Sequence, residues 1–144
     1  NWHHKKSFRI RTEGHKHIIN FKKKLKSLSD EEVVVKEEFE FPINEDRDLE
    51  VFIALQRDFG FYEWIHKKKV TELFVYNRDK KLHFEIKKVS KLGYWLGVEY
   101  LCNNKKEVFM AKNLIKEIIS VIGDGLGEID NTGYTKMLFS LKKR

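Results

Sequence analysis

The sequence predicts an α+β domain in which an antiparallel β-barrel forms a tunnel and helices pack on its outside. Strand-like segments alternate charged with apolar residues, other segments repeat apolar residues at helical spacing, and tight turns join the later strands. The chain has 144 residues, of which 41% are hydrophobic and 13% aromatic, which is enough apolar material for one core. We therefore expect a single domain spanning residues 1–144.

Three segments of strand character open the chain. They cover residues 8–12, 16–25 and 33–43, and each alternates polar with apolar side chains. The charged positions that share a face within these segments are Arg9, Arg11, Lys22, Lys24, Lys36, Glu38 and Glu40. This alternation predicts antiparallel strands with one apolar face turned toward a core.

A helix and a three-strand meander follow. Residues 44–60 predict the helix, with Asn44 as its N-cap and Gly60 as its end. Strand character then returns in segments joined by short turns, at residues 64–76, 82–90 and 94–102. Connections this short require antiparallel pairing.

Two further helices are expected near the end of the sequence. Residues 110–122 repeat Leu and Ile at helical spacing, and a cluster of glycines follows them. A shorter helix is expected from about Thr132 onward. These helices are available to cover the apolar faces of the strands from outside the barrel.

Composition limits the partners and the compartment. Lys and Arg number 29 against 22 Asp and Glu, and the resulting formal charge of +7 favours anionic partners. The single cysteine, Cys102, excludes an internal disulfide framework, and no apolar run reaches the length of a membrane span or of a signal peptide. We expect a cytoplasmic protein without a membrane partner.

Charged side chains recur on one face of strand after strand. They are Arg9, Arg11, Lys22, Lys36, Glu38, Glu40, Lys67, Lys69, Glu85, Lys87 and Glu99. One such face ordinarily looks at water, but its repetition on successive strands favours a shared charged interior. Arg and Lys pair with phosphate oxygens, and carboxylates hold a hard divalent cation that bridges those oxygens. The pattern therefore favours a phosphate-rich ligand with its metal.

Several motifs also follow one another in a recognisable order. They are Phe8-Arg9-Ile10-Arg11, Asn20-Phe21-Lys22, Lys36-Glu37-Glu38-Phe39-Glu40, Lys67-Lys68-Lys69 and Leu92-Gly93-Tyr94-Trp95-Leu96-Gly97-Val98-Glu99. Their order and spacing resemble those of the CYTH domain, the family of triphosphate tunnel metalloenzymes. That family includes class IV adenylyl cyclases, thiamine triphosphatases and inorganic triphosphatases. The resemblance covers nearly the whole chain and implies Mg²⁺ or Mn²⁺ as cofactor.

The resemblance assigns roles residue by residue. It implies phosphate binding by Arg9, Arg11, Lys22, Lys36, Lys67 and Lys69, and Lys87, which shares the charged face, is added to these candidates. It implies metal binding by Glu38, Glu40 and Glu99, and Glu85 is added to these candidates because it lies on the same face. Within the phosphate-binding set, Lys22 and Lys69 are the candidates for a catalytic role. Thr132-Gly133-Tyr134 resembles the start of the family's closing helix and is interpreted as structural.

The sequence also departs from the family pattern. The family's Glu-x-Glu-x-Lys strand belongs before the Arg-x-Arg strand, and residues Asn1 to Ser7 do not supply it. Lys87 stands where the family has aspartate, and Gly97 where it has glutamate; Glu85, on the same face as Lys87, is the candidate replacement carboxylate. Two explanations stay open: an N-terminally incomplete chain, or a degenerate relative that holds an anion without turning it over.

Two classes of function follow. The leading hypothesis is metal-dependent processing of a triphosphate inside the charged tunnel, either conversion of ATP to cyclic AMP or hydrolysis of ATP, thiamine triphosphate or tripolyphosphate. The alternative is a module that binds polyphosphate, nucleotide or RNA without turnover. A domain that binds nucleic acid through outer lysines ranks last. A homodimer is compatible with either hypothesis.

Overall fold

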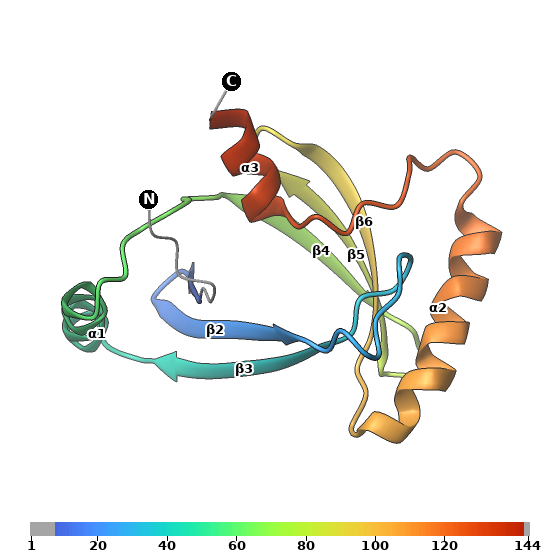
Figure 1. Ribbon diagram of the computed structural model, residues 1–144, viewed down its shortest axis with the longest axis horizontal. Helices are drawn as coiled ribbons and strands as arrows, with labels where there is room; N and C mark the ends of the chain where they lie inside the picture. The colour runs from blue at the N-terminus through green and yellow to red at the C-terminus, as the bar shows by residue number, and fades with distance from the viewer. Residues whose placement is uncertain (1–7, 143–144) are drawn as a thin grey trace. The chain divides into compact units, whose positions relative to one another are not determined.

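The computed structural model describes residues 8–142, which form an α+β structure (Figure 1). In chain order the elements are β1 (Arg9–Glu13), β2 (Lys16–Lys24), β3 (Lys36–Ile43), α1 (Asp46–Asp58), β4 (Lys69–Val75), β5 (Leu82–Val89), β6 (Gly93–Tyr100), the 3-10 helix η1 (Lys105–Glu107), α2 (Val108–Ile122) and α3 (Tyr134–Lys142). The family-like strand expected before residue 8 concerns Asn1 to Ser7, which lie outside the described residues.

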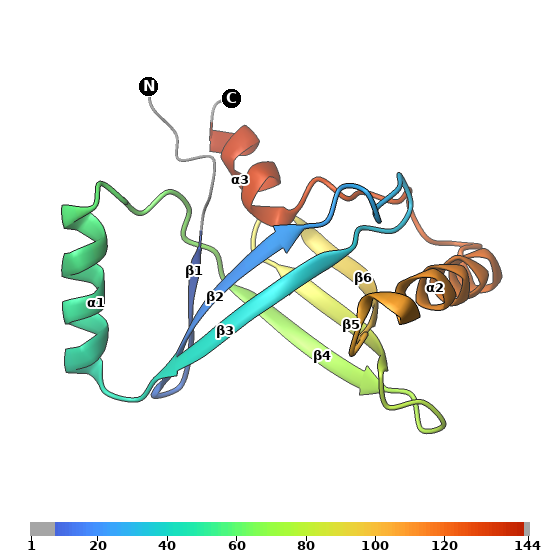
Figure 2. The ribbon, with the colours of Figure 1, turned by 60° about the horizontal axis from the view of Figure 1, so that its bottom comes forward.

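The strands pair into two separate antiparallel sheets, so the predicted closed barrel is wrong. Sheet A has the order β1-β2-β3 and sheet B the order β4-β5-β6 (Figure 2). Closure would require a hydrogen-bonded ladder at every seam, and within residues 8–142 no ladder joins sheet A to sheet B. Alternation in the sequence identifies the polar face of a strand, but it does not identify which strands pair with it. The short turns indicate pairing only between strands of the same sheet.

The chain divides into two compact units. The first runs from the start of the described chain to Ser27 and from Val35 to Trp64, and it contains sheet A and α1. The second contains Leu28–Val34 and the chain from Ile65 onward, with sheet B, η1, α2 and α3. The single domain of residues 1–144 stays a prediction.

Aromatic rings on the apolar face of sheet A pack against one another and against α1, while the buried apolar residues of this unit are Ile19 and Ile43. Phe21 pairs with Phe39 across β2 and β3, and their rings stack with centroids 4.6 Å apart. From α1, the Phe52 ring meets Phe41 edge to face at 6.1 Å and Phe8 at 5.7 Å. The apolar face predicted for residues 33–43 is therefore the face that packs on the helix.

A buried histidine ties the start of α1 to sheet A. His17 is 7% exposed, and its Nε2 lies 2.8 Å from Oδ1 of Asp46, in the first turn of the helix. Its Nδ1 lies 2.9 Å from the hydroxyl of Thr12 on β1. The helix begins at Asp46, one residue later than predicted, because its N-cap is Glu45 and not Asn44. The hydrogen bond between His17 and Asp46 therefore provides a polar tie at this end of α1.

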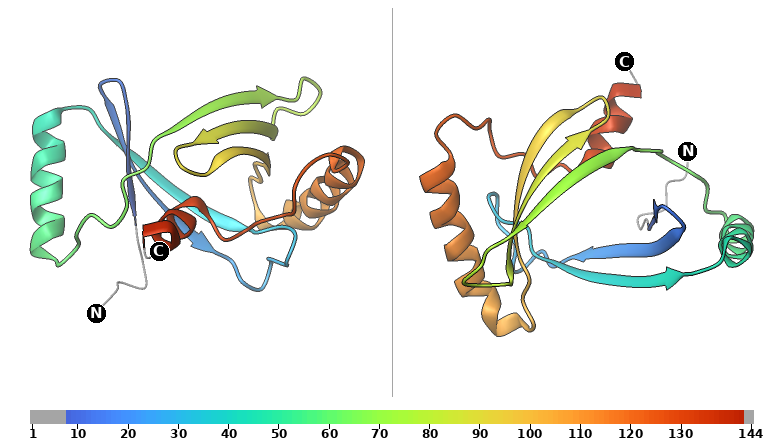
Figure 3. Two further views of the ribbon diagram at one scale, coloured as in Figure 1. Left: turned by 90° about the horizontal axis from the view of Figure 1, so that it is seen from above. Right: turned by 180° about the vertical axis from the view of Figure 1, so that it is seen from behind.

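The second unit is built on sheet B and α2, which lies beside the sheet (Figure 3). The inward positions of α2 are apolar, as the sequence predicts, and its buried residues are Val108, Ala111 and Ile115. Val89 and Leu82 of β5 are almost completely buried. The turn from β5 to β6 places Lys91 and Gly93 in the left-handed region, with φ of 68° and 80°. This tight turn fixes the β5–β6 register.

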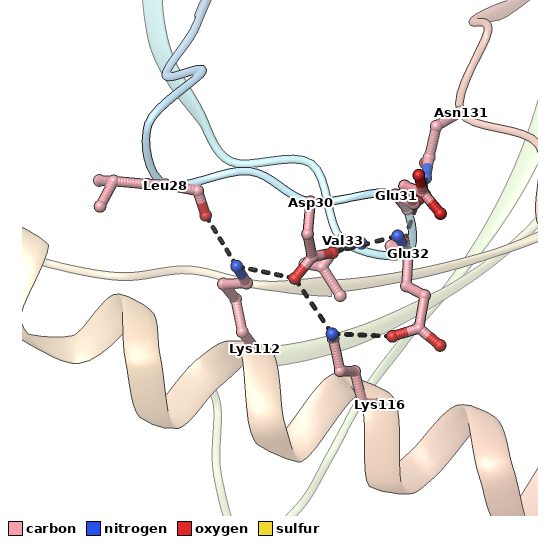
Figure 4. Close-up of polar contacts among 8 residues, drawn as sticks. All are labelled: Leu28, Asp30, Glu31, Glu32, Val33, Lys112, Lys116 and Asn131. Atoms are coloured by element: carbon pink, nitrogen blue, oxygen red, sulfur yellow. Dashed lines mark hydrogen bonds and ion pairs between the residues drawn. The ribbon is translucent and has the colours of Figure 1, made fainter.

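Salt bridges fasten the segment Leu28–Val34 to α2 (Figure 4). Nζ of Lys112 lies 2.8 Å from Oδ2 of Asp30 and also donates to the carbonyl of Leu28 at 2.9 Å. Nζ of Lys116 lies 3.0 Å from the same Asp30 oxygen and 2.8 Å from Glu32. We call these contacts the α2 clasp. Hydrogen bonds from Lys112, from the Val33 amide and from Lys116 hold the pKa of Asp30 well below its usual range.

Candidate functional site: two polar faces

The first candidate site is the polar face of sheet A. We define it by the residues that the register brings together on that face: Arg9, Arg11, Asn20, Lys22, Glu38 and Glu40. Arg9, Asn20 and Glu40 form one row across the three strands, and Lys22 stands opposite Glu38 in the next row. Period-two alternation of the strands places these side chains on one side of the sheet.

Asn20 is the centre of this face. It is 3% exposed, and its side-chain oxygen accepts a hydrogen bond from Nη2 of Arg9 at 3.0 Å. Its Nδ2 donates to Oε1 of Glu38 at 2.6 Å and to Oε1 of Glu40 at 2.7 Å. One neutral amide thus fixes a guanidinium on one side and two carboxylates on the other.

The charges of this face neutralise one another while staying within reach of solvent. Lys22 donates to Oε2 of Glu38 at 2.9 Å, and the two side chains are 33% and 41% exposed. Partial burial opposes ionisation of Glu38, but hydrogen bonds from Lys22 and Asn20 and the charges of Lys22 and Arg9 hold its pKa below the ordinary value. Glu38 is therefore an ionised acceptor at neutral pH.

Both arginines keep unused hydrogen-bonding capacity. Nε of Arg9 is buried and has no hydrogen-bond partner among the described residues. Nε of Arg11 lies 3.2 Å from Oε1 of Glu13, yet the geometry is not that of a hydrogen bond. Buried donors of this kind are rare in folded proteins, and guanidinium groups match phosphate oxygens in shape and charge. The polar face of sheet A can thus accept an anion.

The carboxylates of sheet A fit a magnesium-type ion only in part. Across the described chain, no three His, Cys, Asp or Glu side chains gather as a metal cage. Glu38 and Glu40 are nevertheless neighbouring oxygen ligands held by one amide. Mg²⁺ is usually bound by one or two carboxylates together with substrate phosphates and water. The Glu38–Glu40 pair fits such a site, in which substrate phosphates and water complete the coordination of the ion.

The second candidate site is the polar face of sheet B, in the other unit. We define it by Thr71, Glu85, Lys87, Trp95, Gly97 and Glu99, which alternate onto one side of β4, β5 and β6. Lys87 is 9% exposed and forms an ion pair with Glu85. Lys87 stands between Thr71 and Trp95, and Glu85 stands opposite Gly97. A lysine and a carboxylate therefore already neutralise each other on this face.

Helix α3 contributes to the same face through its first residue. The ring of Tyr134 meets that of Trp95 edge to face, with centroids 5.5 Å apart. Burial, together with the negative charges of Glu85 and Glu99, raises the pKa of Tyr134. Nearby, Lys67 donates to the hydroxyl of Thr135 at 3.0 Å. Tyr134 therefore keeps its proton and presents a hydroxyl near two carboxylates.

Comparison with known proteins gives a fold but no activity. A solved structure of a conserved hypothetical protein from Pyrococcus furiosus matches with a TM-score of 0.67 and 25% sequence identity. The match covers 94% of this chain and 77% of that one. No family model matches the sequence, and no curated protein matches it significantly. The chain is thus similar in fold to a protein whose description names no function.

The residues predicted for one site fall on two faces. Sheet A brings together Arg9, Arg11, Lys22, Glu38 and Glu40. Lys36 stands at the end of β3 opposite Lys24 and is exposed. Sheet B carries Lys69, Glu85, Lys87 and Glu99, whereas Lys67 precedes β4 and bonds to α3.

Three residues of these faces were not predicted as functional. Asn20 shares its face with Lys22, but a neutral amide carries no charge signal. Thr71 shares the parity of Lys69, and Tyr134 belongs to the Thr132-Gly133-Tyr134 motif, for which the resemblance implies a structural role. The alternation of side chains along β2 and β4 is the signal that could have found Asn20 and Thr71.

None of the helices in the described part of the chain is long and apolar enough to span a membrane.

Proposed function

We propose that this chain is a CYTH-type protein that carries out metal-dependent processing of a triphosphate. The reaction is either conversion of ATP to cyclic AMP or hydrolysis of a triphosphate such as ATP, thiamine triphosphate or tripolyphosphate. The observation that supports it most is the Asn20 network, which fixes Arg9, Glu38 and Glu40 side by side on the polar face of sheet A. This network supports the proposal because it brings one candidate phosphate-binding group and two candidate metal-binding groups together.

In this proposal, the cations of sheet A hold the phosphates. Arg9 and Arg11 bring donors that the described residues leave unused, and Lys22 brings an ammonium group 2.9 Å from Glu38. Glu38 and Glu40 would hold Mg²⁺ or Mn²⁺, which supplies charge neutralisation to the phosphate oxygens. A cytoplasmic location belongs to the proposal because the single cysteine favours a reducing compartment.

The contribution of the chain is positioning and electrostatics. Phosphoryl transfer needs little covalent chemistry from the protein, because the main task is to hold the phosphates and stabilise developing charge. Asn20 orients the guanidinium of Arg9 before substrate arrives. Lys22 is the candidate for stabilising charge on the phosphoryl group under attack, because its ammonium group lies on the accessible part of this face.

The test is turnover by the purified full chain and by two matched variants. ATP, thiamine triphosphate and tripolyphosphate are each incubated with Mg²⁺ or Mn²⁺, and cyclic AMP, pyrophosphate and phosphate are quantified. We expect Glu38→Gln to lower kcat by about 100-fold or more, as for loss of a metal or phosphate-positioning group. Glu37→Gln, on the opposite face of β3, should change it less than about twofold. Absence of product from the unmodified chain with every substrate would overturn the enzymatic proposal.

A second candidate is a module that binds polyphosphate, nucleotide or RNA without turnover. It is favoured by Lys87 and Gly97, which stand where the CYTH resemblance calls for metal-binding carboxylates. This candidate predicts binding of tripolyphosphate in EDTA, weakening steeply with salt, and no product. Product formation in the assay above would exclude it.

A further inference from the structure

Lys87 is a charged side chain in an unusually enclosed position. The residue is 9% exposed on the polar face of sheet B, and its ammonium group is ion-paired with Glu85, whose side chain is 17% exposed. A charge taken this far from water is stable only when it is paired and hydrogen-bonded. The ammonium group of Lys87 is therefore a positive charge held in a fixed position on β5.

Gly97 on the neighbouring strand leaves the space that this ammonium group fills. A Cβ added at position 97 would lie 3.0 Å from Nζ of Lys87 and 3.5 Å from Oε2 of Glu85. The first distance is closer than ordinary van der Waals contact, so a larger side chain would have to displace the ammonium group. The glycine and the lysine are thus complementary across β5 and β6.

One hydroxyl group in the same row as Lys87 has no hydrogen-bond partner, and a second lies within electrostatic reach of Glu85 and Glu99. Oγ1 of Thr71, in the same cross-strand row as Lys87, is buried and has no hydrogen-bond partner among the described residues. The Tyr134 hydroxyl lies close enough to Glu85 and Glu99 for their charges to raise its pKa. A buried hydroxyl without a partner beside a fixed cation is suited to a bound oxyanion.

A divalent cation fits this face poorly. Glu85 is already neutralised by Lys87, and the ammonium group would repel a metal ion placed beside it. Glu99 belongs to the same face but is exposed. The electrostatic role that a metal would have on this face is thus taken by the chain itself.

We propose that Lys87 is the resident cation of the polar face of sheet B, and that a phosphate group binds there without a metal, accepting hydrogen bonds from Lys87 and Thr71. The ligand class rests on the proposed function. The consequence is a division of labour: any metal that the protein uses belongs to the Glu38–Glu40 pair of sheet A, and sheet B works without one.

The experiment is calorimetric titration of the full chain with sodium tripolyphosphate in EDTA. We expect Lys87→Met to weaken this metal-free binding by about tenfold or more, and Thr71→Val by about threefold to tenfold. Lys88→Met is the matched control, because Lys88 is the next residue, lies on the opposite face and stacks over the Tyr94 ring. Its affinity should stay within about twofold of the unmodified chain.

A second arm measures the metal directly. The paired substitution Lys87→Asp with Gly97→Glu replaces the resident cation by carboxylates, and Mn²⁺ titration followed by electron paramagnetic resonance counts the bound ions. We expect the double variant to bind one more Mn²⁺ per chain than the unmodified protein does. An equal Mn²⁺ count in the two proteins would overturn the idea that Lys87 stands in for a metal.

The outcomes also separate this inference from the proposed function. Unchanged metal-free affinity in Lys87→Met, or in Thr71→Val should the lysine variant fail to fold by circular dichroism, would overturn the inference even if the enzyme turns over. Failure of turnover alone would overturn the enzymatic proposal and leave these binding measurements valid, because they need no product.

Discussion

Nδ2 of Asn20 donates a hydrogen bond to Oε1 of Glu38 at 2.6 Å, from an amide that is almost completely buried. The same amide binds Glu40 and accepts from Arg9. A neutral residue thus organises three charged ones, and its removal would leave polar groups on the sheet A face without their partner.

Replacing Asn20 by Leu tests that organisation. The side chain keeps a similar volume but offers no donor or acceptor to the three charged groups. We expect the free energy of unfolding to fall by about 1–3 kcal/mol, the usual cost of unsatisfied buried polar groups. Urea denaturation measures it. Because the Asn20 hydrogen bond is one cause of the lowered pKa of Glu38, NMR titration should show that pKa rising in the variant. An unchanged Glu38 pKa would contradict this view.

The α2 clasp predicts a loss of stability in acid. The pKa of Asp30 is lower in the folded chain than its usual value, so the carboxylate contributes stability above a pH of about 4. That contribution declines as pH falls from about 4 toward the lower folded pKa, because protonation breaks the pairs with Lys112 and Lys116. The melting temperature of Asp30→Asn should therefore differ most from that of the parent chain at neutral pH and approach it in acid. Asp124→Asn, at an exposed position, is the control and should follow the parent curve throughout.

The buried histidine of the first unit predicts a local effect on α1. His17→Leu removes the partner of both Thr12 and Asp46. We expect a loss of about 1–3 kcal/mol in unfolding free energy, measured by urea denaturation. His15→Gln is the matched control, because His15 is exposed in the adjoining turn. Equal stabilities of the two variants would show that the His17 contacts contribute nothing.

Gly97 and Lys87 should behave as a coupled pair. Gly97→Ala introduces a Cβ 3.0 Å from Nζ of Lys87, the flexible end of that side chain, and we expect it to destabilise the fold by about 1 kcal/mol, the low end of the cost of overpacking. In a Lys87→Met background the same change should cost less, because the group that the Cβ meets is gone. A double-mutant cycle by urea denaturation measures the coupling, and we expect at least about 0.5 kcal/mol. Strict additivity would contradict the complementarity of the two positions.

Much of the local structure was predictable from residue periodicity. Alternation in residues 33–43 identified which side of β3 is apolar, and Phe41 does pack on Phe52 of α1. Helical spacing located α2 and its buried Ile115. Periodicity works here because it depends only on neighbours along the chain.

What could not be predicted depends on which strands become neighbours. The closed barrel was wrong because strand pattern does not determine how the edges of a sheet are paired. The contact of Gly97 with Lys87 depends on the β5–β6 register, and the bond from Lys112 to Leu28 joins residues 84 positions apart. The role of Asn20 in the site could not be predicted from the pattern of charged residues, because its side chain is a neutral amide.

The α2 clasp also determines how the gene can be divided. Because Leu28–Val34 belongs to the second unit while β2 and β3 on either side of it belong to the first, neither unit is encoded by one uninterrupted stretch. A cut after Trp64 would leave Lys112 and Lys116 without Asp30, their carboxylate partner from the other side of the cut. A gene cut at that point would therefore separate the two halves of the clasp.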